Sequence, residues 1–265
     1  MLKALAILIL ATPAALAEDL SLDTSGLQDC GTTTAAETLG GARFKTPEGL
    51  TVKLALVKAP EFWEPSSEYT SWPHAVEAKK HLMEVLRDQT VTLYCEGQKT
   101  NRLGELVAHA VMPDGSWLQH NLVRDGHVFV FPSPTRRRGL DKLYDAELEA
   151  RAAKKGLWIF KNLQPVAATG NSVKAGWFQI VEGVVVDAAK VRDTVFLNFG
   201  DDWRTDFTVE IPALTARYFD RIGLDPLSLE GQHIEVRGWI DFKSGPRLLL
   251  QGPGQIRIIK HESQP

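Results

Sequence analysis

The sequence lacks the motifs that mark several large enzyme classes. It has no Gly-rich phosphate loop, no Gly-x-Ser-x-Gly elbow and no Cys/His pattern with the spacing of a zinc site. The seven histidines are scattered, and His74 and His81 are spaced too widely to serve as an i, i+4 pair of metal ligands. The sequence therefore does not indicate P-loop, serine-hydrolase or zinc-dependent chemistry.

An excess of basic residues is also missing. Thirty Lys and Arg stand against 33 Asp and Glu, which gives a net charge of −3, or −4 without residues 1–17, which hold one lysine. Proteins that hold a long phosphate backbone usually show a clear basic excess, because counterion release supplies much of their affinity. The overall charge therefore weighs weakly against nucleic acid as the main partner.

Long apolar runs are confined to the N-terminus. Residues 1–17 combine Lys3, an apolar run over residues 5–10 and the sequence Ala15-Leu16-Ala17, which together indicate a secretory signal peptide with an Ala-x-Ala cleavage site. The run is too short to span a bilayer, and no later stretch is apolar enough to do so. We expect a periplasmic or secreted protein with no stable membrane span after cleavage.

Cysteine is scarce, because Cys30 and Cys95 are the only two. In an oxidising compartment they could form a disulfide that ties the N-terminal arm to a strand of the first domain. Closing so long a loop would contribute about 4 kcal/mol in the chain-entropy model. Two buried, unpaired thiols are the alternative, because the sequence does not show whether the pairing geometry is met.

The length of 265 residues favours two modest domains. In the first, short strand patterns precede a helix expected over residues 140–155, which fits a small barrel with helices packed on it. A stretch of small and polar residues then separates it from a second region that is rich in strand patterns. The expected boundaries are a signal peptide at 1–17, an arm at 18–39, the first domain at 40–162, a linker at 163–175 and the second domain at 176–262.

The second region has the element order of an OB-fold barrel, which is three strands, a helix and two strands. The helix is expected over 214–222, and another β topology is an equal alternative. The chain is thus expected to be mainly β with helices, in the α+β class, with a second small β-barrel. The expected strands cover residues 177–186, 194–199, 207–211, 233–240 and 247–259.

Several short motifs in the first domain occur in the order known from one enzyme family. They are Val52-Lys53-Leu54, Ala59-Pro60-Glu61, Asn101-Arg102-Leu103-Gly104, Pro113-Asp114-Gly115, Asn121 to Gly126, and Ala146-Glu147 through Arg151 to Gly156-Leu157-Trp158. Over roughly residues 40–160 the chain resembles the staphylococcal nuclease (thermonuclease-like) family. The resemblance implies a nuclease-type OB barrel with packed helices.

Members of that family cleave phosphodiesters with calcium, two phosphate-clamping arginines and a glutamate assigned as the base. On this resemblance, Ala42 stands where a calcium-binding aspartate is expected, and Lys58 stands at the second acidic ligand. Calcium needs several oxygen ligands, usually carboxylates. Both replacements therefore oppose metal binding.

The two family arginines fall on Lys53 and Glu105. A lysine cannot give the forked contact of a guanidinium, and a glutamate repels phosphate. Glu61 keeps the position of the base, but beside Lys53 and Lys58 we expect it to join an ion-pair cluster in place of the metal. Losing one stabilising group typically costs about a hundredfold in rate, and here several are replaced together.

The resemblance therefore predicts an exported thermonuclease-like protein without calcium nuclease activity and without a cofactor. It would act as a binding or structural module for nucleic acid or for an envelope protein. The alternative is an active nuclease with a rearranged metal site, and calcium would be its cofactor only in that case.

Two further features could contact an anion or a nucleic acid. Arg136, Arg137 and Arg138 form the densest basic run, for which a solvated loop is the alternative. Trp203 and Trp239 could stack on bases, although aromatic residues in strands more often belong to the core.

Overall fold

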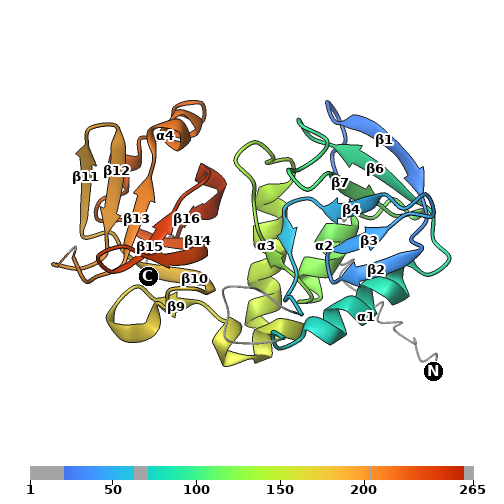
Figure 1. The fold of residues 1–265 in the computed structure, drawn as a ribbon, viewed down its shortest axis with the longest axis horizontal. Coiled ribbons are helices and arrows are strands. Elements are labelled where there is room, and N and C mark those ends of the chain that lie inside the picture. The colour runs from blue at the N-terminus through green and yellow to red at the C-terminus, as the bar shows by residue number, and fades with distance from the viewer. Residues whose placement is uncertain (1–20, 63–70, 203, 260–265) are drawn as a thin grey trace, which may run out of the picture.

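The computed structural model describes residues 21–62, 71–202 and 204–259. The predicted signal peptide at 1–17 and Trp203 lie outside these residues. The described chain forms two units side by side, coloured blue to yellow-green and yellow to red in Figure 1. None of the helices in the described ranges has the length and apolar content that crossing a membrane requires. The mixture of helices and strands confirms the predicted α+β class.

The first unit is built on a six-stranded sheet with the strand order β1-β6-β7-β4-β3-β2. β4 and β7 pair in parallel, whereas the other neighbours pair antiparallel, and β5 and β8 form a separate antiparallel pair. The strands are β1 (Gln28–Thr33), β2 (Glu37–Gly40), β3 (Arg43–Lys45), β4 (Thr51–Leu54), β5 (Val57–Lys58), β6 (Val91–Cys95), β7 (Leu106–Val111) and β8 (Phe129–Val130).

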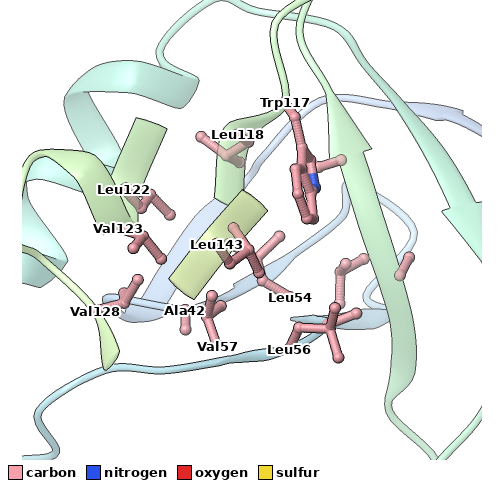
Figure 2. Close-up of a cluster of buried hydrophobic side chains, with 14 of the residues drawn as sticks. Ala42, Leu54, Leu56, Val57, Trp117, Leu118, Leu122, Val123, Val128 and Leu143 are labelled. Carbon is pink, nitrogen blue, oxygen red and sulfur yellow. The ribbon is translucent and has the colours of Figure 1, made fainter. Parts of the chain in front are cut away.

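Three helices pack on this sheet: α1 (Ala75–Leu86), α2 (Leu118–Arg124) and α3 (Leu140–Ala152). α1 buries Ala75, Ala78, Leu82 and Leu86, which recur at helical spacing on one face. Figure 2 shows apolar side chains from β4, β5, α2 and α3 meeting in the core, among them Leu54, Val57, Leu122 and Leu143. Burial of this apolar stripe is what holds the short helices in place.

A close backbone contact joins the end of α3 to the turn after α2. Gly126 (φ 74°) and Gly156 (φ 51°) both have left-handed backbones, and the Leu157 N–H donates to the Gly126 carbonyl at 2.8 Å. A Cβ atom on Gly126 would lie 2.4 Å from the Lys155 carbonyl oxygen. Glycine is therefore required here, and the contact fixes the residues that follow α2.

The N-terminal arm is partly folded onto the sheet. Its residues 28–33 form β1, which pairs with β6. Cys30 and Cys95 form a disulfide with a Cα–Cα distance of 6.0 Å. The structure thus pairs the two cysteines whose pairing the sequence leaves open.

The second unit contains a sheet with the order β11-β12-β13-β15-β14-β10-β9, and β16 also pairs with β14. β13 and β15 pair in parallel, and β10 runs through Val185 and Val186 directly into β11, so this one segment supplies the end strand on one side of the sheet and the last strand but one on the other. α4 (Ala213–Asp220) lies between β13 and β14 in the chain. The strands are β9 (Val166–Ala167), β10 (Phe178–Val184), β11 (Asp187–Val191), β12 (Thr194–Asn198), β13 (Thr208–Ile211), β14 (His233–Phe242), β15 (Pro246–Leu249) and β16 (Ile256–Ile258).

Three sequence predictions differ from this unit. β11 was not predicted, because none of its five residues is buried and the strand carries no alternating apolar signal. The strand expected over 247–259 is divided into β15 and β16 by the 3-10 turn Pro253–Gln255. The stretch expected to be a linker, 163–175, is packed on the second unit, since β9 pairs with β10 and Ala168 is buried against Gly183.

Aromatic rings form the first contact between the two units. Trp72 and Phe129 of the first unit lie 6.1 Å and 5.4 Å, between ring centroids, from Phe178 of β10. Trp239 of β14 lies 6.2 Å from Trp72 in an edge arrangement. Such pairs add to the apolar burial, so this cluster joins the two units.

An ion network that is closed to solvent forms the second contact. Glu147 of α3 and Glu235 and Arg237 of β14 are each 1% exposed. Arg237 Nη2 donates to Glu147 Oε1 at 2.8 Å and also contacts Glu235, while Arg151 Nη1 donates to Glu235 Oε2 at 2.5 Å. Burial alone would raise the pKa of Glu235, but Arg237 and Arg151 lower this pKa well below its ordinary value. The network fixes β14, and with it Trp239, against the first unit.

Candidate functional site

A pocket of about 340 Å³ lies where β3, β4 and β5 of the first unit meet β14 of the second. The turn between β2 and β3, the β3–β4 hairpin and the residues after β5 contribute one wall each, and β14 contributes Trp239. The side chains that decide its chemistry are Ala42, Arg43, Lys53, Lys58, Glu61 and Trp239. Three of these six are predicted replacements, Glu61 is the retained position of the family base, Trp239 is a predicted contact, and Arg43 is new.

Arg43 and Lys53 are cross-strand partners in the β3–β4 hairpin, so their side chains leave the same face of the sheet. Burial lowers the pKa of Lys53, and the nearby Arg43 lowers it further. Arg43 Nε lies 3.4 Å from Glu105 Oε1, and Asn101 Nδ2 donates to the other oxygen of Glu105 at 2.6 Å. Glu105 is thus held by Arg43, which replaces some of the positive charge that the family arginine would supply.

Lys58 is held by a carboxylate and three aromatic rings. Its Nζ lies 3.5 Å from Glu61 Oε1, as the predicted ion pair requires. The same Nζ lies 5.2 Å from the Trp72 ring centroid, 5.8 Å from that of Phe178 and 5.1 Å from that of Trp239. Cation–π attraction therefore adds to the ion pair. The aromatic contact between the units also forms one side of the pocket.

The residues in the pocket do not fit calcium. Ala42 is 6% exposed and belongs to the apolar core that Figure 2 shows, so it offers only a methyl group at the position where the resemblance predicted a calcium ligand. Glu61 is the one carboxylate among the six side chains named above, and Lys58 is bound to it. Calcium takes six to eight oxygen ligands. Within the described residues no group of three or more His, Cys, Asp or Glu is placed to hold a metal ion.

The other residues predicted to contact an anion or a nucleic acid do not lie together in the structure. Trp239 is half-buried and lines the pocket, so it is neither a free stacking face nor a pure core residue. The arginine run lies elsewhere: the Arg136 guanidinium contacts the Gln98 carbonyl, the backbone N–H of Arg137 donates to Glu96, and Arg138 Nη1 donates to Asp23 at 2.8 Å. Trp203 lies outside the described residues.

Three histidines that the sequence analysis treated as separate lie together. His74 Nε2 and His127 Nδ1 are 3.0 Å apart, and the rings of His81 and His127 stack with centroids 3.9 Å apart. A spacing of seven residues is two helical turns, so His74 and His81 share a face; the test for an i, i+4 pair missed this. Burial, together with the neighbouring His81 and His74, lowers the pKa of His127 to about 4.

Comparison with known proteins identifies a family for the first unit. A search among curated proteins finds no match to this chain. The family model of the staphylococcal nuclease homologue matches residues 51–160, a range that holds β4 to β8, the three helices of the first unit and three of the six pocket side chains named above. The resemblance seen in the sequence is therefore confirmed, and residues 51–160 form a staphylococcal nuclease homologue domain.

Proposed function

We propose that the staphylococcal nuclease homologue domain of this protein is an exported phosphate-binding module that contacts nucleic acid without calcium-dependent cleavage. Domains of this family bind nucleic acids in general. The observation that carries the proposal is the pocket, in which Arg43, Lys53 and Lys58 surround the carboxylate of Glu61. These three cations face two carboxylates, Glu61 and the Glu105 that pairs with Arg43, which leaves a local positive charge that suits a phosphate group.

The same residues argue against phosphodiester cleavage. Phosphoryl transfer depends on positioning and on charge stabilisation of the phosphoryl oxygens. Ala42 and Lys58 do not supply calcium ligands, and Glu61 is engaged by Lys58.

The expected target is a short phosphate-containing segment. The chain as a whole is mildly acidic, so a long backbone would meet repulsion beyond the pocket. Trp239 adds an aromatic face at the pocket wall, which can contact a base next to the bound phosphate. Binding through a few contacts predicts a shallow dependence of affinity on salt.

A fluorescence anisotropy titration tests the proposal. The purified protein is titrated against a 5′-labelled thymidine decamer in low salt with EGTA, beside the variants Lys53→Met and Lys45→Met. Lys45 lies on the neighbouring strand with 45% of its side chain exposed and outside the pocket, so this control changes the net charge equally. We expect Lys53→Met to weaken binding about tenfold and Lys45→Met to leave it within about twofold. Equal losses in both variants, or no binding at low salt, would contradict the proposal, and the latter would favour an envelope protein as partner.

An active nuclease is the second candidate, and one observation favours it. Glu61 is retained at the position of the family base and lines the pocket. In that case hydrolysis of a phosphodiester would depend on Glu61 and on a metal bound at another set of ligands.

A further inference from the structure

A second cavity, of about 550 Å³, lies on the second unit and is separate from the nuclease homologue domain. Its floor is the outer face of β11, β12, β13 and β15, and its rim includes Asp206 and the turn of Lys243 and Ser244 between β14 and β15. Phe196 and Val191 supply apolar surface, and 58% of Val191 is exposed.

The alternation of inward and outward side chains along each strand explains why this face carries both apolar and polar residues. Along β12 and β13 the inward residues Val195, Leu197 and Val209 are at most 4% exposed. The intervening residues therefore face outward, and cross-strand register aligns them in two rows. One row runs Ala189, Phe196 and Glu210, and the other runs Asp187, Asn198, Thr208 and Arg247.

The guanidinium group of Arg247 in the cavity is already paired with carboxylates. Arg247 Nη1 lies 2.6 Å from Glu210 Oε2, and Arg247 Nε donates to Asp241 at 2.8 Å. Asn198 Nδ2 donates to Asp187 Oδ2 at 3.0 Å, which fixes this carboxylate. An anionic ligand would thus have to compete with carboxylates that already pair with Arg247.

We propose that this cavity binds a neutral carbohydrate. The C–H face of a sugar ring packs on Phe196 and Val191, and its hydroxyl groups form hydrogen bonds with the outward polar row, chiefly with Asp187 and Thr208. A concave, partly apolar surface with a few fixed polar groups is the usual form of a small-ligand site, and fixed partners are needed because each sugar hydroxyl gives up water on binding.

Two other ligand classes fit less well. A polyanion would face Asp187, Asp206 and Glu210 against Lys243 and an already paired Arg247. A peptide that adds a strand would need free backbone groups, but β12 and β13 each have neighbours on both sides, and at the outer edge of β11 the Ala188 N–H already donates to Glu230. Sugar recognition uses side chains alone, which are what this face presents.

Isothermal titration calorimetry on the purified protein tests this inference with maltohexaose, cellohexaose and N-acetylchitohexaose as probes. We expect saturable binding of at least one probe, about tenfold weaker in Phe196→Ala and lost in Ala189→Phe, which fills the cavity without removing a core side chain. Leu214→Ala, at a 70% exposed position of α4 away from the cavity, should bind as the unmodified protein does.

The outcomes that would overturn the inference are equally specific. They are the absence of saturable binding for all three probes, an unchanged affinity in both cavity variants, and binding of only a thymidine decamer or an uncharged hexapeptide. Lys53→Met should leave sugar binding unchanged, so the result is independent of the function proposed for the first pocket.

Discussion

Two clusters of charge in this molecule use similar residues in opposite surroundings. At the contact between the units, Glu147, Glu235 and Arg237 are each 1% exposed, and their charges are closed into one network. In the pocket, Arg43 remains 35% and Glu61 27% exposed, and cations outnumber carboxylates. Buried charges must each be paired to offset their lost hydration, whereas charges that stay partly exposed remain accessible to a ligand. The first cluster can therefore hold the structure together, and the second can attract a ligand.

The largest expected effect comes from opening the buried network. Arg237→Ala would leave Glu147 and Glu235 buried without their main partner, and would remove the hydrogen bond from Arg237 to the Val130 carbonyl. We expect a loss of about 3 to 5 kcal/mol in the free energy of unfolding. Urea denaturation followed by circular dichroism measures it. Arg217→Ala, at an exposed position of α4, is the control and should change stability by less than about 0.5 kcal/mol. Similar losses of stability in the two variants would show that the buried network contributes no more than an exposed arginine does.

A second effect should appear on acidification, and it belongs to the histidine cluster. His127 binds a proton near pH 4 in the folded state, whereas an unfolded histidine does so near pH 6.5. The unfolded state thus binds more protons between these values, so stability falls as the pH is lowered through this window and levels off below pH 4. Partial exposure reduces the expected loss to about 1 to 2 kcal/mol.

The histidine cluster and the buried ion network should lose their contributions to stability at different pH values. The lowered pKa of Glu235 places loss of the interface network at a more acidic pH than the histidine window. Unfolding curves of His127→Gln between pH 7 and pH 4 should therefore be flatter than those of the unmodified protein. If stability falls with pH as steeply in His127→Gln as in the unmodified protein, the acid sensitivity arises from groups outside the histidine cluster. Asp125 and Glu77 are the acidic groups that oppose the shifts of His127 and His74, and they remain in this variant.

In the pocket, removing a cation should change the salt dependence of binding. Lys53→Met is expected to reduce the slope of log affinity against log salt concentration by about 1, which corresponds to one lost phosphate contact. Anisotropy titrations at several salt concentrations give the slope for this variant and for Lys45→Met. An unchanged slope for Lys53→Met would mean that the phosphate does not reach this side chain.

The smallest effect is expected from Glu61. Glu61→Gln removes the carboxylate that Lys58 contacts at 3.5 Å, so the excess of positive charge in the pocket rises. Oligonucleotide affinity should increase by about two- to fivefold, because an exposed ion pair contributes only about 0.2 to 1 kcal/mol. A weaker affinity would show that Glu61 itself contacts the ligand.

Much of the first domain could be predicted from the sequence, because its motifs are local and occur in a fixed order. Lys53, Lys58 and Glu61 lie within ten residues, so their meeting follows from one strand and the turn after it. The helical spacing of Ala75, Ala78 and Leu82 likewise places α1.

The rest depends on contacts between distant parts of the chain. Trp239 reaches the pocket only because β14 is held against α3 by Arg237 and Glu147, which are 90 residues apart. The sequence does not predict that these two residues form a buried ion pair, since glutamate and arginine usually lie on a solvated face. The cavity on the second unit was missed for a related reason, because β11 carries no periodic signal and register alone aligns its rows.

The central claim is that this nuclease homologue domain binds phosphate without calcium chemistry, and a cleavage assay tests it most directly. The purified protein is incubated with a 5′-labelled thymidine decamer in calcium or in EGTA, and the products are separated on a denaturing gel. The account predicts an uncut oligonucleotide and the same affinity in both buffers. Calcium-dependent cleavage that disappears in Glu61→Gln would contradict it.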